Sequence, residues 1–187
     1  MEMMRVVAGS KKGHPLQAVP GKGTRPTVDK VKESIFNMIG PYFDGGLVLD
    51  LYAGTGGLGI EALSRGAEKC IFVDANRKAI GIVQQNLSST EMNEKAEVYR
   101  NDANRALNAL KKRELMFNIV FLDPPYAEQK IESQIAIMVD HGLLAPNAMI
   151  VAEHDVKDEL CNQIGSVDKI REVTYGQTMI TVYRNEG

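Results

Sequence analysis

The fold is decided by residues 47–66, which have the sequence LVLDLYAGTGGLGIEALSRG. A short apolar run ends at Asp50, a glycine-rich turn follows, and an apolar segment from Leu58 to Ser64 is closed by Gly66. This order predicts a buried strand, a tight turn and a helix. Such a unit begins a Rossmann-like, doubly wound α/β fold, in which helices cover both faces of a mostly parallel sheet.

The turn contains three glycines, Gly54, Gly56 and Gly59, with the spacing GxGxxG. In a doubly wound fold this turn lies at the carboxyl edge of the sheet, where glycines let the backbone approach a ligand. Asp74 ends the next predicted strand about 20 positions after Gly54, where a carboxylate can bind ribose hydroxyls. The pattern therefore predicts a nucleotide-like cofactor.

The identity of that cofactor depends on Asp50, because the glycine spacing suits both NAD and S-adenosylmethionine. A carboxylate shortly before Gly54 would repel a pyrophosphate but can help to hold the ammonium of a methionine moiety. Asp102, after the third predicted strand, can accept a hydrogen bond from an adenine amine or cap the helix expected at 103–112. We therefore favour S-adenosylmethionine, with S-adenosylhomocysteine as its product.

The rest of the chain alternates strands and helices and predicts one α/β domain. The last two strands are joined by a turn at Tyr175-Gly176-Gln177, which is too short for a parallel crossover, so they must form an antiparallel hairpin. The expected strands are 70–74, 97–100, 118–122, 149–153, 169–174 and 178–183, and the expected helices between them are 76–88, 102–112 and 128–141.

The chain begins with a basic segment: residues 1–34 hold seven lysines and arginines against three acidic residues, in a chain of net charge −2. Arg5–Ala8 and Leu16–Val19 predict a basic β-hairpin, and a helix with an apolar stripe that includes Tyr42 begins after Thr27. We expect an arm at 1–27 on a catalytic domain at 28–187. Removal of residues 1–23 should leave the affinity for S-adenosylmethionine, the donor, intact. Either the cations bind RNA or they form a solvated face. The candidate RNA-binding residues are Arg5, Lys11, Lys12, Lys22 and Arg25.

A second motif, Asp123-Pro124-Pro125-Tyr126, follows the strand expected at 118–122. Because prolines supply no N–H, the turn presents acceptors, namely the Asp123 carboxylate and the Pro124 carbonyl. Two acceptors can hold an exocyclic amine in line with a methyl sulfonium, and Tyr126 can stack on the base. The four residues are our candidate catalytic residues, with a rigid structural loop as the alternative.

These motifs, together with Arg5–Gly9, Thr24–Thr27, Val31–Asn37 and Leu58–Ala67, resemble the RsmD family of class I methyltransferases. The resemblance runs from Arg5 to Tyr183. It implies transfer of a methyl group from S-adenosylmethionine to a guanine N2 amine of 16S ribosomal RNA. The cofactor-binding residues that we assign are Asp50, Ala53, Gly54, Gly56, Leu58, Asp74, Asp102 and Ala103.

Three other functions share part of this pattern: an adenine-N6 methyltransferase of DNA or RNA, an NAD-dependent dehydrogenase, and a non-catalytic RNA-binding module. The motif itself does not separate guanine N2 from adenine N6. We expect no metal site, because His14, His141 and His154 are scattered and the two cysteines stand alone. Without a signal peptide or a long apolar run, the chain is expected to act in the cytoplasm without a membrane. Its oligomeric state is left open.

Overall fold

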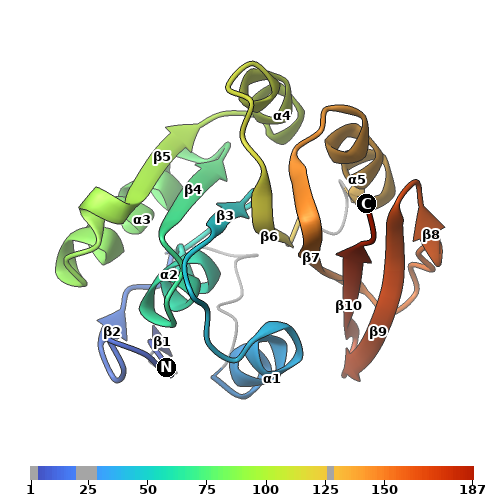
Figure 1. Cartoon of the computed structure of the whole chain (residues 1–187). Helices are drawn as coiled ribbons and strands as arrows, with labels where there is room; N and C mark the ends of the chain where they lie inside the picture. Colours follow the sequence, from blue (N-terminus) through green and yellow to red (C-terminus); the bar gives the residue numbers. More distant parts are fainter. Residues whose placement is uncertain (1–3, 20–28, 126–128) are drawn as a thin grey trace. The chain divides into compact units, whose positions relative to one another are not determined.

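The computed structural model describes residues 4–19, 29–125 and 129–187 (Figure 1). The chain forms two compact units, Met1–Ala103 and Asn104–Gly187. The predicted division into an arm at 1–27 and a catalytic domain at 28–187 is a functional one, and it stays a prediction.

The first unit is built on three parallel strands, with β4 paired to β3 on one side and to β5 on the other. Strand β4 is apolar on both faces, as expected for a strand between two layers, and its Cys70 side chain is fully buried. The elements of this part are α1 (Asp29–Ile39), β3 (Leu47–Asp50), α2 (Gly57–Ser64), β4 (Lys69–Asp74), α3 (Arg77–Ser89), η1 (Asn93–Lys95) and β5 (Ala96–Arg100).

The N-terminal segment forms the predicted antiparallel hairpin, but its strands are shorter than expected. They are β1 (Met4–Arg5) and β2 (Pro15–Leu16). The predicted first strand is wrong in extent because the N–H groups of Val7 and Ala8 donate to the carboxylate of Glu61, at 2.9 and 3.0 Å, instead of to a partner strand. Residues 7–11 of the hairpin are thus bonded to Glu61 and Ser64 of α2.

Helix α1 buries Lys32, Ile35 and Phe36 and ends at Ile39. The prediction that Tyr42 continues its apolar stripe is wrong, because the helix stops before Pro41 and Tyr42 is 63% exposed. The ring of Tyr42 instead lies 5.9 Å from the guanidinium carbon of Arg65. The predicted N-cap, Thr27, lies outside the described residues.

In the second unit, β6 pairs with β7 in parallel, while β10 pairs antiparallel with both β7 and β9. The predicted C-terminal hairpin is confirmed, with Gly176 at φ +60° in its turn. Strand β7 begins earlier than predicted, because its register with β6 shifts and Asn147 adopts φ +63°. The elements are α4 (Ala103–Lys111, which begins at the boundary), β6 (Phe117–Leu122), α5 (Ile131–Asp140), β7 (Leu144–Asp155), β8 (Gln163–Ile164), β9 (Val167–Tyr175) and β10 (Thr178–Asn185).

The close packing of α2 on β4 predicts the effect of replacing Gly59. A Cβ atom at this position would lie 2.3 Å from Cε1 of Phe72 and 2.7 Å from Sγ of Cys70. Gly59→Ala should therefore lower the free energy of unfolding by about 1–3 kcal/mol through overpacking. Gly81→Ala on α3 is the matched control, because nothing lies within 4 Å of its added Cβ, and it should be neutral or slightly stabilising. Thermal melts of both variants test this, and equal melting temperatures would contradict it.

Candidate functional site

The glycine-rich turn between β3 and α2, residues 53–57, is here called the donor loop. Its backbone is tied to the end of β4: the N–H of Ala53 donates to the carbonyl of Val73 at 2.9 Å, and the N–H of Gly54 donates to Oδ2 of Asp74 at 2.8 Å. The other carboxylate oxygen of Asp74 accepts from the N–H of Asn76 at 2.9 Å. Gly54 and Asp74, two of the eight predicted cofactor-binding residues, therefore meet at the carboxyl edge of this sheet.

Asp50 ends β3 and is almost completely buried, at 2% exposure. Its Oδ2 accepts a hydrogen bond from the N–H of Gly59 at 3.1 Å, inside the first turn of α2. Burial raises the pKa of Asp50 to about 7; the Gly59 hydrogen bond opposes this rise and the nearby Asp74 charge adds to it. A buried carboxylate with a pKa this high is a candidate functional group, because strongly shifted pKa values cluster at functional sites and a cationic ligand would stabilise its ionised form.

The glycines of the donor loop have distinct structural roles. Gly54 has φ +58°, and a Cβ there would meet no atom within 4 Å, so the backbone faces open space that a ligand can fill. Gly56 has φ +81° and is the N-cap of α2. Leu58 in the first turn of α2 and Ala53 before the glycines are both buried. The buried carboxyl group of Asp50 and the open backbone at Gly54 fit a donor that carries an ammonium and no phosphate.

Asp102 and Ala103 follow β5, at the same edge as Asp74. Strand β5 is in register with β4 so that Arg100 pairs with Asp74, and the N–H of Asn101 donates to the carbonyl of Asp74 at 3.1 Å. Asp102 directly precedes α4 and is exposed, whereas Ala103 is buried. The structure thus places Asp50, Asp74 and Asp102 at the ends of three neighbouring strands, as the sequence predicted.

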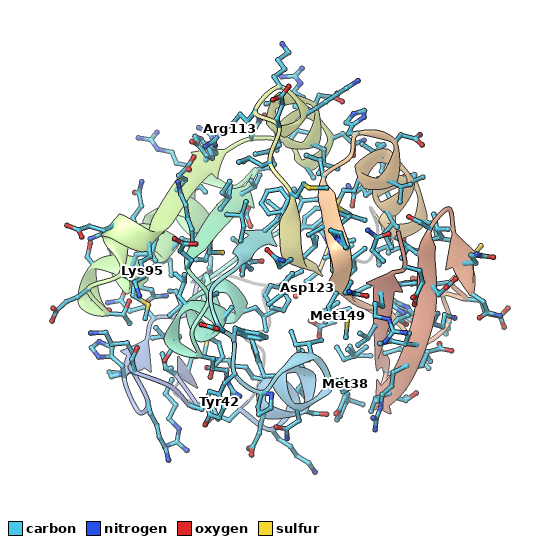
Figure 2. All side chains as sticks on the ribbon, in the orientation of Figure 1. Met38, Tyr42, Lys95, Arg113, Asp123 and Met149 are labelled. Atoms are coloured by element: carbon cyan, nitrogen blue, oxygen red, sulfur yellow. The ribbon has the colours of Figure 1, made fainter. Side chains whose placement is uncertain are left out.

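The second motif lies in the other unit. Figure 2 shows Asp123 directly after β6, where it is half-buried. Pro124 is buried and Pro125 is exposed, while Tyr126 lies outside the described residues. A carboxylate fixed at a strand end by two prolines has little conformational entropy to lose when it binds an amine.

The candidate RNA-binding cations differ in their surroundings. Arg5 pairs with Asp29 through Nε and Oδ2 at 2.8 Å, on the surface. Lys11 and Lys12 lie in the hairpin turn, where Lys12 is exposed and Lys11 is half-buried. Lys32, counted in the basic segment, is fully buried and is no part of a cationic surface. Lys22 and Arg25 lie outside the described residues.

Sequence reasoning missed a buried polar cluster that joins the hairpin to the first unit. Glu61 on α2 accepts from Nε of Arg65 at 2.7 Å, lies 3.9 Å from Nζ of Lys32, and also accepts from the hairpin N–H groups described above. Burial lowers the pKa of Lys32 and the Glu61 charge opposes that shift. The available signal was a polar residue on an apolar helix stripe: Lys32 lies between Val28 and Ile35, three or four positions from each.

This cluster changes what truncation of the arm would do. Deletion of residues 1–23 would leave the Glu61 carboxylate without two of its donors and uncover Met4 contacts at the start of α2. The expectation that donor affinity survives this deletion stays a prediction, and these contacts argue against it, since the hairpin lies in the same compact unit as Asp50, Gly54 and Asp74. Point substitutions in the hairpin turn are the better test of RNA contacts.

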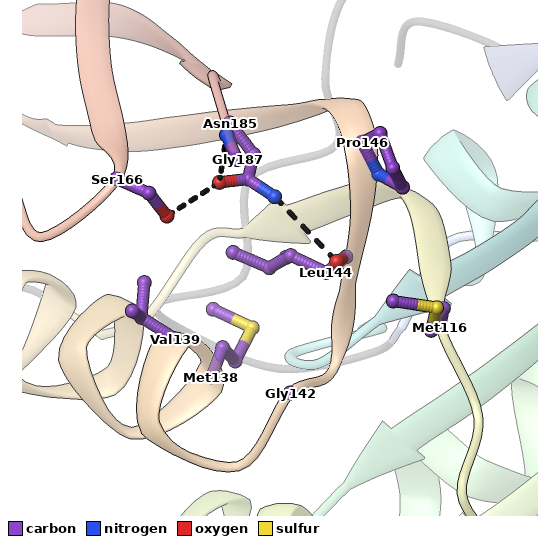
Figure 3. A pocket seen from close by; sticks show the side chains of 9 residues that line it. All are labelled: Met116, Met138, Val139, Gly142, Leu144, Pro146, Ser166, Asn185 and Gly187. Carbon is purple, nitrogen blue, oxygen red and sulfur yellow. Dashed lines mark hydrogen bonds between the residues drawn. The ribbon is translucent and has the colours of Figure 1, made fainter.

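A cavity of about 190 Å³ lies in the second unit, where β6 and β7 begin (Figure 3). None of its nine lining residues is charged. The Asn185 side chain spans its wall: Oδ1 accepts from Oγ of Ser166 at 2.6 Å, and Nδ2 donates to the carbonyl of Leu144 at 3.5 Å. Asp123 follows the opposite end of β6, roughly 20 Å along the strand. This cavity is therefore separate from the predicted catalytic turn.

The described residues contain no group of three or more His, Cys, Asp or Glu side chains arranged to hold a metal. His154, at the end of β7, is buried and its Nε2 lies 2.7 Å from Oγ1 of Thr181, which makes it a structural residue of the sheet. In the part of the chain that the structure describes, no helix is both long and apolar enough to span a membrane.

Comparison with known proteins supports the predicted family. The family model described as "Conserved hypothetical protein 95" matches residues 4–184. The chain is 32% identical to ribosomal RNA small subunit methyltransferase D of Escherichia coli, over 98% of this chain and 90% of that protein. The chain belongs to this family. It is also 56% identical to the Bacillus subtilis protein YlbH, over 98% of this chain and all of that one.

The fold class is confirmed by a solved structure. The Escherichia coli protein yhhF aligns with a TM-score of 0.85 and 30% identity, over 100% of this chain and 99% of that chain. The predicted Rossmann-like class I methyltransferase fold is therefore correct. The predicted enzyme class, an rRNA methyltransferase that uses S-adenosylmethionine, is confirmed together with the family.

The burial of Asp50 predicts how Asp50→Asn changes stability with pH. The pKa of Asp50 rises from its ordinary value of 3.8 to about 7 on folding, so the folded state binds this proton more tightly than the unfolded state. The Asp50 contribution to stability is therefore fully present below about pH 4 and is lost as the pH rises through about 7. An asparagine keeps an oxygen for the Gly59 N–H and does not titrate.

As the pH rises from about 4 to 7, the free energy of unfolding of the wild type should therefore fall relative to that of Asp50→Asn. Urea denaturation at a series of pH values measures this difference. Donor affinity should show the opposite dependence, because only the ionised carboxylate attracts an ammonium: wild-type affinity should rise towards pH 7.5 and that of Asp50→Asn should stay low. Parallel pH profiles for the two proteins would contradict the assignment.

Proposed function

We propose that this chain transfers a methyl group from S-adenosylmethionine to the exocyclic N2 amine of a guanine in the 16S RNA of the small ribosomal subunit. The observation that carries the proposal is the Asp123-Pro124-Pro125 turn at the end of β6, in a chain that matches ribosomal RNA small subunit methyltransferase D over nearly its whole length. The choice of guanine N2 rests on the family resemblance. An rRNA substrate also favours action in the cytoplasm.

On the donor side, we propose that Asp50 binds the ammonium of the methionine moiety and Asp74 the ribose hydroxyls. The support for Asp74 is its position beside Gly54, where it accepts from the loop N–H and keeps further lone pairs for ribose. Asp102 and Ala103 are assigned to the adenine end, since they follow the next strand of the sheet. Ala53, Gly54, Gly56 and Leu58 are assigned to the backbone wall of the site.

On the acceptor side, we propose that Asp123 and the Pro124 carbonyl accept the two N–H groups of the target amine. When bound, the donor supplies a methyl group activated by its sulfonium. The exocyclic amine of a base is a weak nucleophile, and two acceptors can orient its lone pair and stabilise the positive charge that develops on nitrogen. Tyr126 is proposed to stack on the base once it has left its helix stack.

Loss of the Asp123 acceptor should slow methyl transfer with little effect on donor binding. Asp123→Ala removes a hydrogen bond to a charged group, worth about 1.5–3 kcal/mol, so the single-turnover rate should fall about 10- to 150-fold. Asp140→Ala, an exposed carboxylate at the end of α5, is the matched control and should be unchanged. Digestion of the RNA and identification of the methylated nucleoside then separates N2-methylguanine from N6-methyladenine. Near wild-type turnover by Asp123→Ala would remove Asp123 from the mechanism.

The hairpin cations should contribute to RNA affinity through phosphate contacts. If Lys11 and Lys12 each neutralise one phosphate, Lys11→Ala/Lys12→Ala should make the slope of log affinity against log salt less steep by about 1.4. The control is Lys111→Ala/Lys112→Ala, which removes two adjacent exposed lysines from the end of α4. Filter binding at several salt concentrations measures both slopes. Equal slopes would show that the hairpin lysines are only a solvated face.

A further inference from the structure

The side chain of Asn86 connects the hairpin to the donor loop. Asn86 lies on α3 and is 1% exposed. Its Oδ1 accepts from the N–H of Gln17 at 2.8 Å, and its Nδ2 donates to the carbonyl of Gln17 at 3.0 Å and to the carbonyl of Thr55 at 2.9 Å. Asn86 thus pairs with the end of the hairpin as a neighbouring strand would, and the same amide holds the donor loop.

The hydrogen bond to the carbonyl of Thr55 lies in the part of the donor loop where flanking glycines leave the backbone most conformational freedom. Thr55 stands between Gly54 and Gly56, both at positive φ, and its Oγ1 accepts from the N–H of Gly57 at 3.1 Å. Because glycines impose little on the backbone, hydrogen bonds to neighbouring elements must fix the orientation of this peptide. The Asn86 amide supplies one such bond, from inside the unit.

The hairpin is held as firmly on its other side. Nζ of Lys32 donates to the carbonyl of Arg5 at 2.9 Å, and Glu61 binds the N–H groups of Val7 and Ala8. Gly9 runs so close to α2 that a Cβ there would lie 1.9 Å from the carbonyl oxygen of Ser64. Because the hairpin contacts α1, α2 and α3 at these points, a ligand that holds the donor loop can also restrain Gln17 through Asn86.

We propose that Asn86 is a positioning residue that couples the two binding events, so that occupation of the donor loop and engagement of RNA by the hairpin favour each other. The proposal rests on the proposed function for the identity of the two ligands. A ligand that orders the donor loop also orders Gln17 through Asn86, and the second ligand then meets a hairpin that is already ordered. Thermodynamic linkage requires the effect to be reciprocal.

Amide hydrogen exchange with and without S-adenosylhomocysteine tests the coupling in the full-length wild-type protein. The product should slow exchange in the donor loop and, several-fold, at the hairpin amides of Val7, Ala8 and Gln17, which belong to the predicted RNA-binding arm. This readout does not depend on the folding of any variant, and the Asn86 variant below tests whether the protection passes through that side chain.

Asn86→Asp is the variant that should break the connection. An aspartate is nearly the same size and still accepts from the Gln17 N–H, but it turns oxygen towards the carbonyls of Gln17 and Thr55, where the amide donated. We expect about a tenfold loss of S-adenosylhomocysteine affinity by calorimetry and no product-dependent protection of the hairpin. Asn93→Asp, the same change at an exposed position of η1, is the matched control and should behave as wild type.

The outcomes separate this proposal from the proposed function. Protection of the donor loop with unchanged hairpin exchange in the wild type overturns the coupling and leaves the donor assignment standing. Absence of any protection by the product overturns both. Hairpin protection that persists in Asn86→Asp shows that the coupling runs through other contacts, and it removes Asn86 from this role.

Discussion

The first unit depends on the hydrogen bonds and ion pairs that one buried carboxylate makes, that of Glu61. A charge at this depth would be costly alone, yet here it meets the N–H groups of Val7 and Ala8, the guanidinium of Arg65 and, at 3.9 Å, the ammonium of Lys32. Removing one partner of such a buried set leaves the others uncompensated, which typically costs several kcal/mol. The hairpin, α1 and α2 all contact the Glu61 carboxylate. The donor loop leads directly into α2, so it is connected to the same cluster.

This arrangement gives the N-terminal segment two roles that its sequence does not separate. Its turn presents the exposed Lys12 and the half-buried Lys11, whereas its backbone amides and Lys32 complete the interior of the first unit. The composition of this segment is that of a basic arm, but part of the segment lies in the core of the first unit. A loss of activity after its deletion could come from lost RNA contacts or from damage to the first unit. Substitution of Lys11 and Lys12 in the turn is more informative, because it changes only the possible RNA contacts.

The sequence predicted the elements that depend on local pattern. The strand, glycine turn and helix at 47–66, the antiparallel pair at the C-terminus and the three aspartates at strand ends are all where periodicity and turn chemistry placed them. The polar cluster and Asn86 depend on tertiary contacts between segments far apart in sequence. Lys32 and Asn86 are both buried on helices, but the sequence alone shows neither their burial nor the distant segments that they contact.

The motif GxGxxG alone does not identify the cofactor, and the structure explains why. Gly54 leaves open space, Gly56 caps a helix in a left-handed conformation, and Gly59 lets α2 approach Phe72, so two of the three glycines serve the fold and would serve it for any nucleotide. The glycines therefore leave the choice of cofactor to other residues, and we propose that Asp50 makes it. Its carboxyl group is 2% exposed and burial raises its pKa to about 7, so a positive charge beside it would stabilise the ionised form. A donor with an ammonium supplies such a charge, whereas a pyrophosphate would be repelled.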